Sequence, residues 1–231
     1  GSKKILVFAP TWTEKQTKGN TLDIVTEYLN QYNVLNNELG NEYNILLKVH
    51  PFVFKRIRHI SELQTIVVND AIDANDLLAL TDILLTDYSS IFFDYLITDK
   101  PVIFYDTTDE YADNRGYYFD LETLPGPHFD QLQDVVEFIK KADYSDFIAN
   151  YTDFKKRFIA NDHGDATEKL IKLFINNSYS TSNLVEATHN KKKALIYTGG
   201  LQANGISEAL INLVNSIDPN KYDISLLTAY S

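Results

Sequence analysis

Short apolar runs alternate along the chain with segments whose apolar positions recur at helical spacing. The runs expected to form buried strands are Lys4–Ala9, Tyr43–Val49, Gln64–Asn69, Ile83–Thr86 and Pro101–Tyr105. Helices are expected after the capping residue Asn20 and over Asn75–Leu80, Ser89–Ile97, Leu132–Ala142 and Tyr151–Asn176. Strands that alternate with helices at this pitch predict an α/β fold, with a Rossmann-like parallel sheet and helices on both of its faces.

The pattern breaks near residue 177. Residues 178–192 are polar and rich in Ser and Thr, which is typical of a linker. A new strand is then expected at Ala194–Tyr197, followed by a helix over Ile206–Ile217 and a strand over Tyr222–Leu227. A single βαβ unit buries too little area to be stable by itself. We therefore expect one domain over residues 1–177 and the start of a second Rossmann-like domain over residues 193–231.

Composition supports a folded protein without a transmembrane helix. Hydrophobic residues make up 44% of the 231 residues, which is enough for a sizeable core. No stretch of 18 apolar residues occurs, so no transmembrane segment is expected. The absence of cysteine excludes disulfides and thiolate metal sites, and together with the absence of a signal peptide it favours the cytoplasm. Gly1-Ser2 at the start and the lack of methionine suggest an excised segment.

The charge is strongly negative and unevenly distributed. A net charge of −11 argues against nucleic acid as a partner. Residues 3–58 carry 8 Lys and Arg against 5 Asp and Glu, whereas residues 59–150 carry 4 against 19. A phosphate ligand in the acidic region would need local cations or free backbone N–H groups.

Unusual polar residues follow the predicted strands, at the edge where ligands bind in such folds. They are Pro10-Thr11-Trp12, His50-Pro51, Asp87-Tyr88-Ser89-Ser90 and Asp106. The segment Thr86–Ser90 could bind a diphosphate through hydroxyls and free N–H groups, although Ser89 or Ser90 could equally be a simple helix cap. His50 could contact phosphate or act as acid or base, or bond only to backbone; no second histidine stands at metal-ligand spacing.

Arg115 stands out in the acidic stretch. Its guanidinium suits phosphate and Gly116 allows close backbone approach, but Arg115 could also neutralise the neighbouring acids Asp109, Glu110 and Asp113. No Gly-x-Ser-x-Gly, Walker or Gly-x-Gly-x-x-Gly motif is present, which argues against serine hydrolysis, nucleotide triphosphate hydrolysis and hydride transfer.

Seven ordered motifs together resemble the CDP-glycerol glycerophosphotransferases, the teichoic acid primases and polymerases of Gram-positive bacteria. The motifs are Ala9-Pro10-Thr11-Trp12, Lys48-Val49-His50-Pro51, Asp73–Leu78, Thr86–Tyr95, Lys100–Tyr105, Arg115–Asp120 and Pro125-Gly126-Pro127. The resemblance covers about residues 3–177. It implies the C-terminal, donor-binding lobe of a GT-B-like transferase that moves glycerol phosphate from CDP-glycerol to a teichoic acid hydroxyl and releases CMP.

The resemblance also implies roles for individual residues. His50 and Arg115 would contact the donor phosphates, and Thr86, Asp87, Ser89 and Ser90 would hold the diphosphate. Asp94 and Glu110 would contact ribose or glycerol or make supporting contacts, and Thr11 and Trp12 would line the cleft that faces the other lobe. The general base, a histidine of the other lobe, has no counterpart here, so this segment is expected to be inactive alone. No cofactor or metal is implied; the lipid-linked acceptor would bind through the other lobe, and the parent protein would attach peripherally to the inner face of the membrane.

Two features keep alternatives open. Many family members carry Arg where this chain has Trp12. The phosphate contact of that arginine would be lost here or supplied by Lys15 or Arg56. CDP-ribitol therefore stays possible as the donor. The tail, with Lys193–Gly200 and Asn204–Ser207, resembles the opening of a retaining GT-B glycosyltransferase. A nucleotide-sugar glycosyltransferase lobe and a non-catalytic module of envelope assembly are the competing interpretations.

Overall fold

The computed structural model describes residues 2–12, 19–106, 123–141, 144–176, 191–200 and 204–228. The chain divides into two compact units, Gly1–Asp162 and His163–Ser231, and each has its own sheet.

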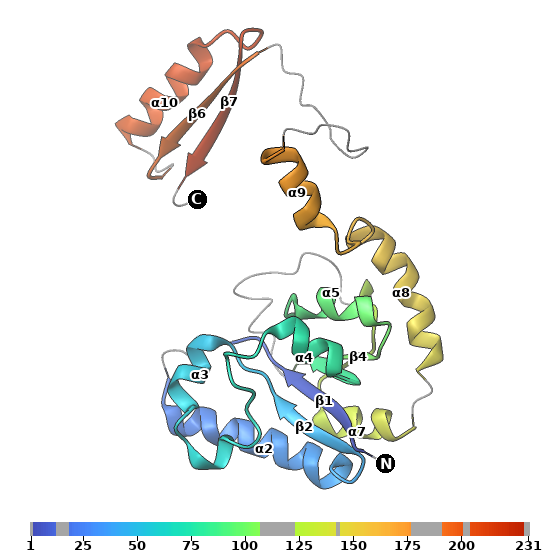
Figure 1. Cartoon of the computed structure of the whole chain (residues 1–231). Coiled ribbons are helices and arrows are strands. Elements are labelled where there is room, and N and C mark those ends of the chain that lie inside the picture. Colours follow the sequence, from blue (N-terminus) through green and yellow to red (C-terminus); the bar gives the residue numbers. More distant parts are fainter. Residues whose placement is uncertain are drawn as a thin grey trace. The chain divides into compact units, whose positions relative to one another are not determined.

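The first unit is built on a parallel sheet of five strands (Figure 1). The strands are β1 (Lys4–Ala9), β2 (Tyr43–Leu47), β3 (Ile83–Thr86), β4 (Val102–Tyr105) and β5 (His128–Phe129). Their order is β2-β1-β3-β4-β5. The chain therefore moves from β1 to one side and then returns to pair β3 with the other side of β1. This arrangement confirms the predicted α/β fold with a parallel sheet.

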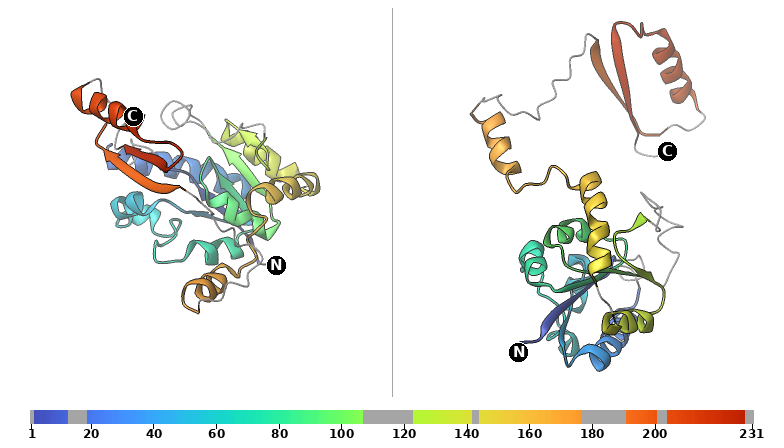
Figure 2. Two further views of the ribbon diagram at one scale, coloured as in Figure 1. Left: turned by 90° about the horizontal axis from the view of Figure 1, so that it is seen from above. Right: turned by 90° about the vertical axis from the view of Figure 1, so that its right-hand side faces the viewer.

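Helices cover both faces of this sheet (Figure 2). Against one face pack α2 (Thr21–Leu39), α3 (Pro51–Ile57) and α7 (Leu132–Lys141), and against the other pack α4 (Ala74–Leu80), α5 (Ile91–Tyr95) and α8 (Ser145–Phe158). Successive strand residues point to opposite faces. Leu6 and Phe8 of β1 thus belong to the first core, while Val7 and Ala9 belong to the second.

Local sequence signals explain most of these elements, with three exceptions. The first is strand β5, which was not predicted. The Asn20 side chain accepts a hydrogen bond from Leu22 N–H at 3.0 Å and caps α2, as predicted. The predicted strand Gln64–Asn69 is wrong, because only Val67 bridges Leu47. Just before this segment, the chain turns through the 3-10 helix η1 (Ser61–Leu63). The N–H groups of Ile66 and Val67 both donate to Leu63 O. Helix α3 was not predicted; it begins at Pro51, shortly after β2 ends at Leu47.

A buried tyrosine ties α8 to the sheet and yields a stability prediction. The hydroxyl of Tyr151 is fully buried and accepts a hydrogen bond from Val102 N–H at 2.9 Å. Tyr151→Phe leaves this N–H without a partner, so we expect a loss of about 2 kcal/mol in the free energy of unfolding, measured by urea denaturation. Tyr95→Phe is the control. The Tyr95 hydroxyl donates a long hydrogen bond (3.4 Å) to Thr81 O, and Lys100 Nζ also donates to this oxygen at 2.6 Å, so Thr81 O keeps a donor in the variant. An equal loss in both variants would contradict this account.

The second unit contains α9 (Ala166–Phe174), β6 (Lys192–Thr198), α10 (Gly205–Ser216) and β7 (Tyr222–Thr228). Strands β6 and β7 pair in parallel from Lys192↔Tyr222 to Thr198↔Thr228, which is the predicted βαβ unit. Alternate β6 residues are highly exposed: Leu195 is 68% exposed and Tyr197 66% exposed. Among the described residues of the whole chain, no helix has the length and apolar character needed to span a membrane.

Candidate functional site

The polar strand ends predicted from the sequence meet at the carboxyl edge of the first sheet. The strand order reverses between β1 and β3, because β1 lies between β2 and β3. In open α/β sheets, ligands bind in the crevice at such a switch point, outside the carboxyl ends of the strands. Thr11 follows β1 and Asp87 follows β3, so both lie at this point.

Asp87 joins the two strand ends across the switch point. Its Oδ2 accepts a hydrogen bond from Thr11 N–H at 2.6 Å, and its Oδ1 accepts one from the Thr11 hydroxyl at 2.6 Å. Oδ1 also accepts from Ser89 N–H, two residues ahead, at 3.1 Å. We call Thr11, Asp87 and Ser89 the switch-point clamp. Because the Asp87 carboxylate is occupied by backbone and hydroxyl donors of the protein, it serves to fix the two turns.

The electrostatic environment of Asp87 yields a second prediction. Burial raises its pKa to about 6, although the hydrogen bonds from Thr11 and Ser89 act in the opposite direction; the charge of Asp106 adds to the rise. Since the folded-state pKa lies above the ordinary value of 3.8, the proton binds more tightly to the folded protein. The part of the stability that is linked to protonation of Asp87 is complete below pH 3.8 and is lost as the pH rises through about 6. We expect a midpoint near 6 when the carboxyl carbon of Asp87 is titrated by NMR, and no such loss of stability in Asp87→Asn. A midpoint near 4 would contradict it.

The segment after β3 offers two hydroxyls but only a short helix. Helix α5 has five residues and continues as the 3-10 helix η2 (Leu96–Thr98), so it contributes little dipole to an anion. Ser90 stands at the N-cap position without capping α5, and within the described residues the hydroxyls of Ser89 and Ser90 form no hydrogen bond. They are thus available to a ligand. Thr86 is fully buried and its hydroxyl donates to Ala9 O at 2.6 Å, so it links β3 to β1.

His50 lies at the same edge, where it caps α3 and packs among aromatic rings. Its Nδ1 accepts a hydrogen bond from Phe52 N–H at 3.2 Å. Burial lowers the pKa of His50, which favours the neutral ring. With Nδ1 as acceptor, the neutral ring carries its proton on Nε2, where it can donate to a phosphate oxygen. The ring centroid of His50 lies 5.6 Å from that of Trp12 and 4.9 Å from that of Phe52, and Phe52 is 58% exposed.

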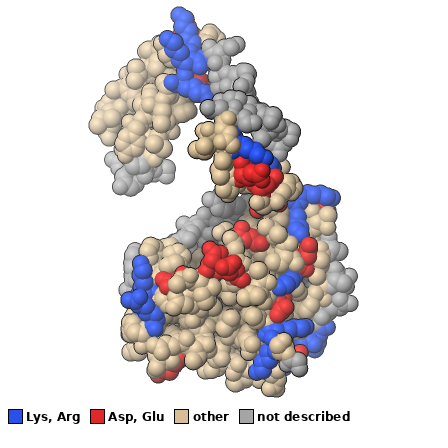
Figure 3. Space-filling view, in the orientation of Figure 1, with Lys and Arg blue, Asp and Glu red and all other residues tan. Residues whose placement is uncertain are grey.

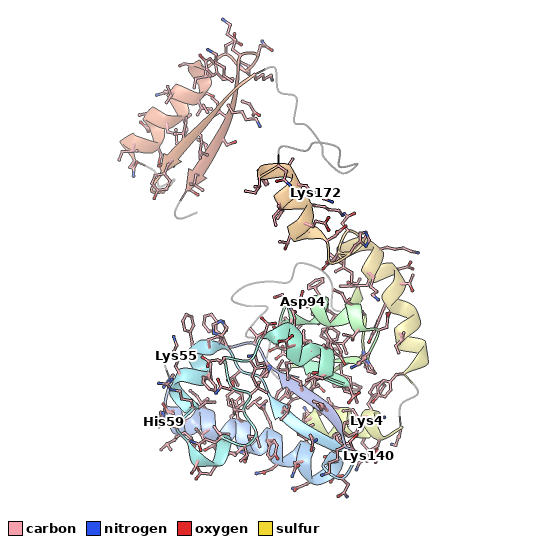
Figure 4. The ribbon with its side chains drawn as sticks, in the orientation of Figure 1. Lys4, Lys55, His59, Asp94, Lys140 and Lys172 are labelled. Atoms are coloured by element: carbon pink, nitrogen blue, oxygen red, sulfur yellow. The ribbon has the colours of Figure 1, made fainter. Side chains whose placement is uncertain are left out.

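Of the remaining predicted residues, the structure describes Asp94 and Arg56. Asp94 projects from α5 and is exposed (Figure 4). The pKa of Asp94 is raised, mainly by partial burial and to a smaller extent by the negative charge of Asp162. Asp94 therefore lies near another acid. Glu110, Arg115 and Lys15 lie outside the described residues. Arg56 Nη2 donates to Gly19 O at 2.6 Å and to the Thr21 hydroxyl at 3.0 Å, so it holds the start of α2.

Sequence reasoning missed Phe52 and the helix that carries it. The available signal was Pro51 directly after His50, because proline is favoured at the first position of a helix. No group of three or more His, Cys, Asp or Glu side chains in the described part of the chain is arranged to hold a metal ion.

Comparison with known proteins identifies relatives of the first unit. Residues 1–176 match the family model described as CDP-Glycerol:Poly(glycerophosphate) glycerophosphotransferase. A teichoic acid poly(glycerol phosphate) polymerase of Bacillus spizizenii is 34% identical over 182 residues, covering 74% of this chain and 44% of the relative. A teichoic acid glycerol-phosphate transferase of Staphylococcus aureus is 32% identical over 179 residues, with 73% and 44% covered. A teichoic acid poly(ribitol-phosphate) polymerase of B. spizizenii is 29% identical, with 73% and 27% covered.

Solved structures give the same result. The wall teichoic acid polymerase TagF superposes with a TM-score of 0.61 at 28% identity, covering 76% of this chain and 43% of TagF. A TagF variant soaked with CDPG superposes with a TM-score of 0.59 at 27% identity, with 76% and 42% covered. The chain thus spans less than half the length of the relatives named here. Because the family model covers residues 1–176 of 231, the chain belongs to the CDP-glycerol:poly(glycerophosphate) glycerophosphotransferase family of teichoic acid biosynthesis.

Proposed function

We propose that the first unit binds CDP-glycerol for transfer of glycerol phosphate to a hydroxyl of a teichoic acid acceptor, with release of CMP. The observation that carries the proposal is the switch-point clamp, which fixes the Thr11 and Ser89 turns beside the hydroxyls of Ser89 and Ser90, and these form no hydrogen bond within the described residues. A donor diphosphate in this position would receive hydrogen bonds from the neutral hydroxyls of Ser89 and Ser90, which lie in the acidic stretch of residues 59–150.

The site residues divide into those that contact the donor and those that position the turns. Ser89, Ser90 and the Nε2–H of His50 are proposed to donate to the diphosphate, together with Arg115. Asp94 and Glu110 are proposed to contact ribose or glycerol. Thr11, Thr86 and Asp87 hold the turns, because their polar side-chain atoms are engaged with each other or with Ala9 O. The site for the reacting acceptor hydroxyl and the general base would come from the part of the relatives that this chain does not cover, so the chain alone is proposed to be inactive.

Isothermal titration calorimetry of the chain with CDP-glycerol, CDP-ribitol, CMP and a UDP-sugar tests the proposal. Binding of CDP-glycerol and CMP, with no heat from the UDP-sugar, is the expected result. CDP-ribitol is included because the relatives comprise both glycerol phosphate and ribitol phosphate enzymes. Preference for the UDP-sugar would favour a nucleotide-sugar glycosyltransferase. A folded protein that binds no nucleotide would refute the proposal.

The exposed ring of Phe52 leads to a third prediction, which concerns where the base of the nucleotide binds. Trp12, His50 and Phe52 form an aromatic cluster beside the clamp, and its outer member offers an open face to a planar base. Stacking of a base on an aromatic side chain contributes about 1–3 kcal/mol, so Phe52→Ala should weaken CMP binding roughly tenfold. The melting temperature should change little, since the ring is largely exposed. Phe52→Tyr is the control and should retain CMP affinity; an unchanged affinity in Phe52→Ala would place the base elsewhere.

We further propose that residues 193–231 begin a second Rossmann-like domain, joined to the donor-binding lobe of residues 1–177 by a linker over residues 178–192. The parallel pairing of β6 with β7 supports this, because parallel sheets are normally covered on both faces and built from more strands. Limited proteolysis tests the proposal: cleavage should concentrate within residues 178–192 and release a fragment that still binds CMP.

A further inference from the structure

Helix α3 begins at the proposed donor site and leads into a basic region. Its N-cap is His50, and its last turn contains Lys55 and Arg56, followed by Arg58. No acidic residue occurs between Glu42 and Glu62, in a chain whose net charge is −11. A local excess of positive charge inside an acidic protein attracts anions to that place.

The cations of this region differ in how they are engaged. Arg56 is bonded to Gly19 O and the Thr21 hydroxyl, and has a structural role. Lys55 and Arg58 are exposed, and among the described residues their side chains have no hydrogen bond or ion pair. Lys55 projects outward from α3, and His59 lies farther along the chain (Figure 4). In the space-filling view, Lys and Arg atoms gather over α3 (Figure 3). These charges are therefore available to a ligand.

A cleft of about 270 Å³ opens beside the end of α3. Its apolar wall is formed by Phe54, Ile57, Leu63 and Val67, and its polar groups are Arg58, Gln64 and Asn69. The Oδ1 of Asn69 accepts a hydrogen bond from Ala71 N–H at 2.9 Å. Because this oxygen accepts from the protein, the N–H groups are the part of the Asn69 amide that is left to donate to a ligand. We call this feature the α3 cleft.

The α3 cleft combines one guanidinium, two amides and an apolar wall. This set suits a small unit that has an anionic phosphate, hydroxyls and a short carbon chain. The volume lies below the range of about 300–1,000 Å³ that is usual for pockets holding ligands of drug size, so a whole nucleotide fits poorly. The nearest acid along the chain, Glu62, accepts a hydrogen bond from the Ser61 hydroxyl and is thereby engaged.

We propose that the α3 cleft is a subsite for a polyol phosphate unit of the growing acceptor chain, with Lys55 as a contact for the next phosphate. The identity of this ligand rests on the proposed function. Helix α3 has seven residues, so the cleft lies about 10 Å from His50 along the helix. A peptide residue has three backbone bonds and is about 3.5 Å long when extended. A glycerol phosphate repeat has six backbone bonds, so its extended length is about 7 Å. Two repeats therefore reach from the donor site to the α3 cleft.

The test uses a synthetic glycerol phosphate trimer titrated into the chain by calorimetry, with and without saturating CMP. The charge-removing variant is Lys55→Gln/Arg58→Gln. The control, Lys140→Gln/Lys141→Gln, removes the same charge from α7, where these lysines pair with Glu38 and Glu137. We expect the trimer to bind the wild-type chain in the presence of CMP, about tenfold weaker binding in the α3 variant, and a change below about twofold in the control.

Three results would overturn the inference: no trimer binding to the wild-type chain, equal weakening in both variants, or displacement of the trimer by CMP. The last would mean that the trimer occupies the donor site. CDP-glycerol affinity, measured on the same samples, separates this inference from the proposed function. It should be unchanged in Lys55→Gln/Arg58→Gln; if the wild-type chain binds the trimer but no CDP-glycerol, the proposed function fails while the subsite remains.

Discussion

Asp87→Ala is expected to abolish measurable CDP-glycerol binding by the chain and to lower its free energy of unfolding by about 3 kcal/mol. The carboxylate accepts from Thr11 N–H, the Thr11 hydroxyl and Ser89 N–H, and alanine leaves all three donors without an acceptor. The turns that follow β1 and β3 are then no longer fixed relative to one another. Hydroxyls displaced by about 1 Å cannot both reach one diphosphate. Calorimetry and urea denaturation measure the two effects.

Asp82→Ala is the matched control for this prediction. Asp82 Oδ2 accepts a hydrogen bond from Ile5 N–H at 2.8 Å and joins the same two strands at the opposite edge of the sheet. Its removal should destabilise the protein by about 1 kcal/mol while CDP-glycerol binding persists. If Asp82→Ala weakened donor binding as much as Asp87→Ala, the effect of Asp87 would be one of general stability, and the positioning role of the clamp would be wrong.

His50→Asn is expected to lower CDP-glycerol affinity roughly thirtyfold with little loss of stability. Asparagine is a favoured N-cap residue and can replace the bond from Phe52 N–H to the histidine ring, so α3 should stay intact. It lacks the Nε2–H that is proposed to reach the phosphate. His50→Ala removes the cap as well and should cost about 1 kcal/mol of stability in addition. Thermal denaturation and calorimetry of both variants separate the cap from the ligand contact.

If His50→Asn bound CDP-glycerol as tightly as the wild-type chain, the imidazole would serve only as the N-cap of α3. If His50→Asn and Arg115→Ala also left the activity of the full-length parent protein intact, a non-catalytic role in envelope assembly would gain support. His50→Gln provides an intermediate case, because its longer amide can still donate toward the phosphate.

The meeting of the polar strand ends at one edge could be predicted from the sequence, because parallel strands bring their carboxyl ends to the same edge of the sheet. Thr11, His50 and Asp87 follow three different strands and lie at that edge as expected. Their individual roles could not be predicted. Whether the Thr86 hydroxyl faces a ligand or Ala9 O depends on the pairing of β3 with β1, about which Thr86 itself carries no information.

The α3 region shows why local patterns mislead in short elements. His50-Pro51 was interpreted as the end of a strand, although the same pair is also a cap and first turn of a helix. With seven residues, α3 is too short for helical periodicity to stand out. The apolar run Ile66-Val67-Val68 has the composition of a strand, yet its hydrogen bonds with Leu47 are limited to those of Ile66 O and Val68 N–H.

The β6–β7 sheet has a practical consequence for work at high protein concentration. In the described part of the second unit, each of its strands pairs only with the other, so each has an outer edge without a neighbouring strand. Leu195, Tyr197 and Leu227 add exposed apolar side chains. Unpaired edges beside apolar surface promote intermolecular strand pairing. Light scattering should therefore detect self-association of the 231-residue chain at concentrations where a chain ending at Asn176 stays monodisperse.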